Sequence, residues 1–114
     1  MQSSTLSLAE QLKRDLHAAM KAREPVRVAT LRTLISALDN ATAVEVDRAL
    51  VPMEGHTPDV PRREVSEDEQ LAILRTEAAG RQRAAAHYEE LGKADEAARL
   101  RAELAVITEY VASA

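Results

Sequence analysis

The chain has 114 residues, which is the size of one domain and allows a single modest hydrophobic core. Cysteine is absent, which excludes disulfides, thiolate zinc ligands and a thiol nucleophile. The net charge of −4 is not typical of a nucleic-acid-binding protein. No run approaches the ~20 apolar residues of a membrane-spanning helix, and the N-terminus lacks the pattern of a secretion signal. We therefore expect a cytoplasmic protein without membrane contact.

Apolar residues recur at every third or fourth position in four segments, and no segment alternates as a strand would. The predicted helices cover residues 7–22, 25–47, 66–91 and 95–111. Pro25 suits the first turn of the second helix, because its missing N–H costs nothing there. Ser66 and Glu69 form a Ser-x-x-Glu capping box at the start of the third helix. Gly92 suits the position just past its end, and Asp95 is a candidate cap for the fourth helix.

Two of the three connections between these helices are short, and short connections favour antiparallel neighbours. The remaining connection, residues 48–65, is long and contains most of the proline of the chain. The predicted fold class is therefore all-α, with four helices arranged as two antiparallel hairpins joined by a long loop. We expect one helical domain over residues 1–114.

Two arginines, Arg27 and Arg81, fall on the apolar stripes of the second and third helices. A guanidinium that faces a core needs a carboxylate partner, because an unpaired buried charge is very unfavourable. Asp15, Glu77 and Glu103 flank the stripes as candidate partners. We predict that these five residues form a structural ion network that fixes how the two hairpins dock. The alternative is a phosphate or carboxylate site around the two arginines.

A second charged feature is the segment from Lys13 to Arg32, which holds six basic and two acidic residues and is thus +4 by 6 − 2. Such a segment is able to face phosphate groups, although most charge runs are solvated surface. The residues that we predict to contact nucleic acid are Lys21, Arg23, Arg27 and Arg32.

No pattern in the sequence predicts a catalytic residue, a metal or a cofactor. The three histidines lack metal-ligand spacing, and the three glycines form no phosphate-binding loop. No sequence motif places a hydroxyl against a catalytic base, and neighbouring acids are typical of helix surfaces. We therefore expect a protein that acts by binding rather than by chemistry of its own.

The order and spacing of several groups of residues resemble the GatB/YqeY family. The opening helix has Asp15 followed by Ala19-Met20-Lys21, and the second helix has Arg27 followed by Leu31-Arg32. The remaining matching residues are Ser66, Glu67, Asp68, Glu69, Glu77, Arg83, Tyr88, Gly92, Asp95, Glu103, Leu104 and Tyr110. The resemblance covers nearly the whole chain, with residues 48–65 the poorest part.

This resemblance implies a multihelical fold related to the tail of the B subunit of the amidotransferase that amidates misacylated tRNA. It implies an accessory role with tRNA or an amidotransferase-type complex as partner. By family description alone, it also implies carbon–nitrogen ligase activity with glutamine as the amido donor. The family is expected to continue past Tyr110 into a second small helical subdomain, which holds the part that best contacts tRNA. In the third helix, Gly80 stands where the family commonly has lysine.

A different function is a protein-interaction or self-association module. Helices with Ala- and Leu-rich faces often bury against a partner the apolar surface that their own fold leaves exposed. The sequence leaves open whether this chain binds tRNA, another protein or itself.

Overall fold

The computed structural model describes residues 6–49 and 65–113 of the chain. It contains four helices, which are α1 (Leu8–Ala22), α2 (Pro25–Ala49), α3 (Glu67–Glu90) and α4 (Ala94–Ala112). These helices, with no strand in the described ranges, confirm the all-α fold class. Residues 48 and 49 of the predicted loop continue α2, and residues 50–64 of that loop lie outside the described residues.

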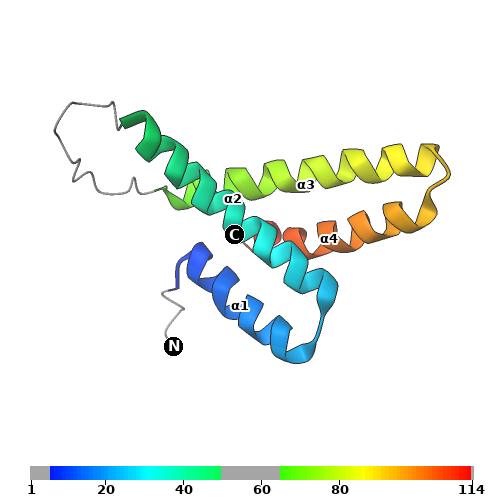
Figure 1. Ribbon diagram of the computed structural model, residues 1–114, viewed down its shortest axis with the longest axis horizontal. Coiled ribbons are helices and arrows are strands. Elements are labelled where there is room, and N and C mark those ends of the chain that lie inside the picture. The colour runs from blue at the N-terminus through cyan, green and yellow to red at the C-terminus, as the bar shows by residue number, and fades with distance from the viewer. Residues whose placement is uncertain (1–5, 50–64, 114) are drawn as a thin grey trace.

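The helices form two antiparallel hairpins (Figure 1). Helix α1 packs along α2, and α3 packs along α4. Helix α2 crosses the second hairpin and contacts both of its helices, while the outer parts of α3 and α4 extend beyond α2 as a two-helix arm (Figure 1). The docking of the hairpins therefore depends mainly on α2 and on the inner ends of α3 and α4.

Two of the helices begin with the same local structure, a capping box. At α3, the Ser66 hydroxyl accepts from the Glu69 N–H at 3.1 Å, and Glu69 accepts from the Ser66 N–H at 2.9 Å. This confirms the cap predicted from Ser-x-x-Glu. At α1, Ser7 and Glu10 form the same pair of bonds, at 3.1 and 2.8 Å. Both boxes satisfy N–H groups that a helix start otherwise leaves without partners.

The predictions for the other helix ends are confirmed only in part. Helix α2 begins at Pro25, and Gly92, just past the end of α3, has φ 75°, both as predicted. Asp95 is not the cap of α4, because Lys93 occupies that position and no side chain caps this end. The connection that contains Gly92 ends at Lys93, so α4 begins at Ala94 and Asp95 lies within the first turn of α4. The end of α1 is also unusual, since Arg23 has φ 57° in the left-handed region.

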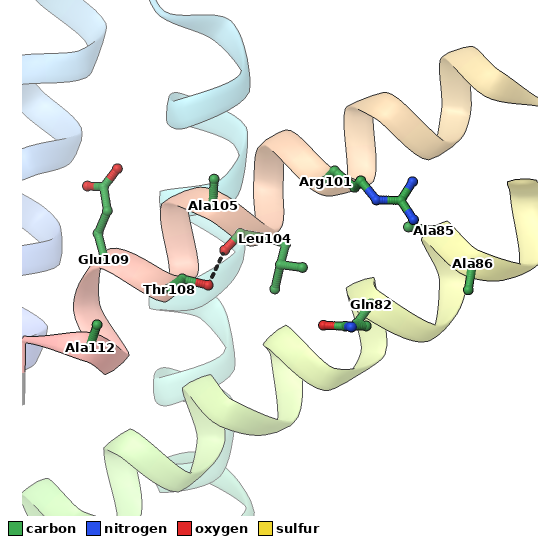
Figure 2. A pocket seen from close by; sticks show the side chains of 9 residues that line it. All are labelled: Gln82, Ala85, Ala86, Arg101, Leu104, Ala105, Thr108, Glu109 and Ala112. Atoms are coloured by element: carbon green, nitrogen blue, oxygen red, sulfur yellow. Dashed lines mark hydrogen bonds between the residues drawn. The ribbon is translucent and has the colours of Figure 1, made fainter.

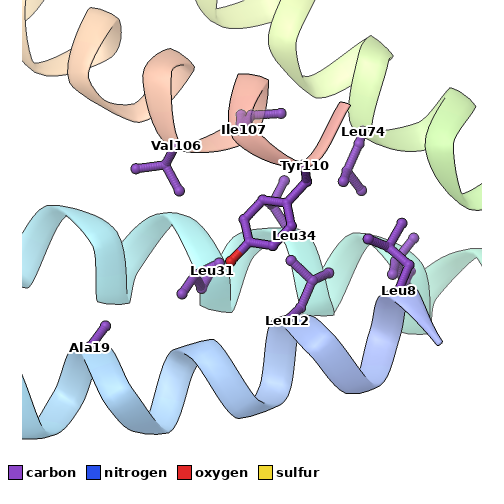
Figure 3. Packing of buried hydrophobic residues seen from close by; sticks show 10 residues of the cluster. Leu8, Leu12, Ala19, Leu31, Leu34, Leu74, Val106, Ile107 and Tyr110 are labelled. Carbon is purple, nitrogen blue, oxygen red and sulfur yellow. The ribbon is translucent and has the colours of Figure 1, made fainter. Parts of the chain in front are cut away.

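The hydrophobic core lies where all four helices meet (Figure 3). Its side chains come mostly from leucines of α1 and α2, with Leu74 of α3 and Ile107 of α4 closing it from the second hairpin. The largest side chains that are fully buried in the described ranges are Leu12, Leu31, Leu34, Leu74, Ile107 and Thr30. This core holds the crossing of the hairpins, and it leaves the outer arm with few buried side chains.

Candidate functional site

The predicted ion network is divided into separate groups of contacts, and the first of these surrounds Arg81. Its guanidinium donates to Glu77 on the same helix at 2.6 Å and to Glu103 on α4 at 3.2 Å. The side chains of Arg81 and Glu103 are each only 16% exposed. Arg99 also lies 3.5 Å from Glu103. The group therefore ties α3 to α4 within one hairpin and does not join the two hairpins.

Arg27 lies apart from that group, which corrects the prediction of one network. Its guanidinium donates to both oxygens of Glu109 on α4, at 2.7 and 3.2 Å. Glu24 lies 3.8 Å away on the other side. The hydrogen bonds to Glu109 raise the pKa of Arg27 above its usual range, so it stays charged. Because α2 lies against the last turns of α4, Arg27 meets Glu109 rather than the predicted Asp15, Glu77 or Glu103.

Asp15 has a different partner, the buried phenol of Tyr110. The Tyr110 hydroxyl donates to Asp15 at 2.6 Å and so links α4 to α1. Burial, followed by this hydrogen bond, raises the pKa of the phenol well above its ordinary value. Arg14 also lies 3.3 Å from the carboxylate. This bond and the pair of Arg27 with Glu109 are thus polar contacts that join the two hairpins, and the sequence reasoning missed both partners on α4.

Two of the four predicted nucleic-acid contacts lie at the turn between α1 and α2. Lys21 lies in the last turn of α1, and Arg23 ends that helix. Arg32 lies further along α2, and all three side chains are exposed. No ion pair in the described ranges involves these three residues. Arg27 differs from them because it is 29% exposed and already paired.

This turn also exposes apolar surface. Met20, near the end of α1, is 46% exposed. A shallow hollow of about 450 Å³ lies between Met20, Pro25 and Val28, with Arg23 and Glu24 at its rim. The basic end of the first hairpin is therefore partly apolar.

A larger hollow, the α3–α4 groove, runs along the second hairpin (Figure 2). It has a volume of about 560 Å³, and most of the side chains around it are small or apolar. The groove is lined by Gln82, Ala85, Ala86, Arg101, Leu104, Ala105, Thr108, Glu109 and Ala112. Toward the arm, Arg101 is paired with Glu89 at 2.7 Å, and at the other end Glu109 is paired with Arg27. The sequence alone did not predict this groove.

Several other polar side chains form hydrogen bonds within their own helices. The threonine hydroxyls of the described ranges each donate to a carbonyl four residues earlier. Within those ranges, no three carboxylates or imidazoles gather as a metal would require, and no helix is long and apolar enough to cross a membrane. The surfaces that stand out are thus the basic turn and the α3–α4 groove.

Comparison with known proteins agrees with the resemblance noted in the sequence. A search of the curated proteins finds no match to this chain. The family model described as Yqey-like protein matches residues 9–114, which include nearly all of the four helices. The chain therefore belongs to the family of YqeY-like proteins.

Proposed function

We propose that this YqeY-like chain is a non-catalytic helical module with an accessory, tRNA-associated role. The observation that carries the proposal is the set of three exposed cations on the first hairpin, two of them at the turn between α1 and α2 and the third two turns along α2. Lys21, Arg23 and Arg32 form no ion pair within the described ranges, so their charge is available to a phosphate backbone. The choice of tRNA comes from the resemblance to the amidotransferase tail.

The dipoles of α1 and α2 oppose each other at this end of the hairpin. Helix α2 begins at Pro25, directly after the turn, and its first turn carries no acidic residue. The positive end of its dipole lies at the turn together with the negative end of α1, so the positive potential there comes from the side chains of Lys21 and Arg23. Glu24 reduces the field only in part, since it lies 3.8 Å from Arg27 and shares that cation with Glu109.

Arg27 has a supporting part in this proposal. Its two bonds to Glu109 keep α2 against α4, and a paired guanidinium offers less to a phosphate than an unpaired one. Arg27 and Arg32 are five residues apart and therefore point about 140° away from each other on α2. The three exposed cations form the proposed contact, and Arg27 holds α2, which carries Arg32, against α4.

A filter-binding titration of the protein with tRNA at low salt tests the proposal. We expect the wild type to bind and a variant with Lys21→Glu, Arg23→Glu and Arg32→Glu to lose most of that affinity. The matched control reverses three exposed basic residues of the second hairpin, Arg75, Arg83 and Lys93, and should bind nearly as the wild type does. Absence of wild-type binding at low salt would remove the tRNA proposal.

The second candidate function is self-association, which the α3–α4 groove favours. An open apolar groove on a small domain is a typical place for a protein partner to bind. Light scattering of the wild type distinguishes a monomer from a dimer, and a monomer at ~100 μM would remove this candidate. The third function, carbon–nitrogen ligase activity, rests on the resemblance alone.

A further inference from the structure

We propose that the α3–α4 groove binds helix α4 of a second copy of the chain, antiparallel and about a two-fold axis near Ala105. The inference rests on the second candidate function, self-association, and is independent of tRNA binding. It specifies the surface, the orientation of the two copies and the residues that set the contact.

The outward face of α4 consists mainly of small side chains. Between Ala98 and Ala112, seven residues of α4 lie within about 60° of Ala105 around the helix axis, at 100° per residue. All seven side chains are exposed. They are Ala98, Arg101, Ala102, Ala105, Thr108, Glu109 and Ala112. Five of the seven also line the groove, so this face and the groove are one continuous surface.

The order of these residues suits a two-fold contact. In an isologous dimer, a residue that contacts a second residue of the partner is contacted by that same residue in return. Arg101 and Glu109 stand four residues before and four residues after Ala105. Antiparallel packing centred on Ala105 therefore places Arg101 of each copy beside Glu109 of the other, in two equivalent ion pairs. Binding to an unrelated partner would not require opposite charges to be placed symmetrically about Ala105.

The small side chains suit the same arrangement. Centring on Ala105 places Ala98 opposite Ala112 and Ala102 opposite Thr108, so small residues meet small residues. The distance between packed helices depends on the side chains at the contact, and alanines permit a close approach. The opposite wall of the groove also exposes alanine, at Ala86 on α3. Both walls of the groove against which the second α4 packs in this proposal therefore carry small side chains (Figure 2).

The internal partners of the two charged residues do not prevent these contacts. Glu89 accepts two N–H donors of Arg101, and a guanidinium has five. Glu109 accepts one bond at each oxygen from Arg27, and a carboxylate has about four acceptor sites. The side chains of Arg101 and Glu109 remain 47% and 53% exposed. Each of them is thus able to gain a second, intermolecular partner.

A charge-reversal experiment with two single variants tests the arrangement. Sedimentation velocity measures the dimer dissociation constant of the wild type, of Arg101→Glu, of Glu109→Arg, and of an equimolar mixture of the two variants. Each variant alone places like charges across the interface, so its dissociation constant should rise about tenfold or more. In the mixture, a heterodimer restores opposite charges at both contacts and should form with near wild-type affinity. In the mixture, each variant still lacks its own internal ion pair, with Glu89 for Arg101→Glu and with Arg27 for Glu109→Arg. A folding defect therefore does not explain a recovery of dimerisation.

The controls are Lys13→Glu and Asp39→Arg, which change charge equally on exposed positions of the first hairpin and should leave the dimer unchanged. A monomeric wild type would overturn both this inference and self-association. A wild-type dimer that neither variant weakens, or a mixture that stays monomeric, would overturn the inference while self-association through another surface stands. The tRNA proposal is unaffected by any of these outcomes, because its three cations lie outside the groove.

Discussion

Arg81 and Arg27 occupy equivalent stripe positions in the sequence, but we expect their removal to have very different effects on stability. Arg81 bridges two carboxylates and is 16% exposed, as is Glu103. Removing one member of a fully buried ion pair destabilises a protein by about 3–5 kcal/mol, whereas an exposed pair contributes roughly 0.2–1 kcal/mol. Glu77 is 27% exposed and Glu103 retains Arg99 nearby, so part of the loss is relieved.

Arg81→Met should therefore lower the free energy of unfolding by about 2 kcal/mol. The corresponding Arg27→Met change should cost less than about 1 kcal/mol, since Glu109 is 53% exposed and its charge returns to water. Urea denaturation followed by circular dichroism measures both values. Equal losses in the two variants, or a larger loss for Arg27→Met, would refute the assignment of these contacts. A double-mutant cycle with Glu103→Gln should give a coupling energy of at least about 0.5 kcal/mol for Arg81.

Three further changes have definite expected outcomes. Tyr110→Phe should cost about 1–2 kcal/mol through loss of the bond to Asp15. Because folding raises the Tyr110 pKa, the contribution of the phenol to stability is complete below the unfolded pKa of about 10 and is lost progressively above it. Urea denaturation between pH 8 and 11 should therefore show a shallower alkaline loss of stability for Tyr110→Phe than for the wild type. Equal losses in the two proteins would contradict the assignment. Gly80→Ala should raise stability by about 1 kcal/mol in thermal melts, because it lies inside α3 and an added Cβ meets no atom within 4 Å. Arg23→Gly should raise stability by about 1 kcal/mol, because glycine adopts the positive φ of this position without steric strain, and it should also weaken tRNA binding. An unchanged melting temperature would contradict the strain at this position.

The helices were predictable because their signals are local. Apolar spacing, the proline at the start of α2 and the box of Ser66 with Glu69 each act within one or two turns. The contact of Arg81 with Glu77 is local in the same sense, since the two residues are four apart on one helix. Arg23 is an exception, because the left-handed end of a helix is usually marked by glycine.

The partners of Arg27 and Asp15 were not predictable, because they depend on how the hairpins cross. Both partners, Glu109 and Tyr110, lie more than 80 residues away and on α4. Helical periodicity specifies which residues share a face, but it does not specify which helix covers that face. One available signal was the Tyr110 hydroxyl itself, since a tyrosine on a buried stripe needs a hydrogen-bond partner. The α3–α4 groove likewise exists only once two helices are placed side by side.

The salt dependence of tRNA affinity tests the proposed role of the basic turn most directly. With phosphate contacts from Lys21, Arg23 and Arg32, a plot of log affinity against log salt concentration should have a slope between roughly −2 and −3. Each single reversal of these residues should make the slope shallower by about 1. A wild-type slope near zero, or a slope that the triple reversal leaves unchanged, would contradict the account.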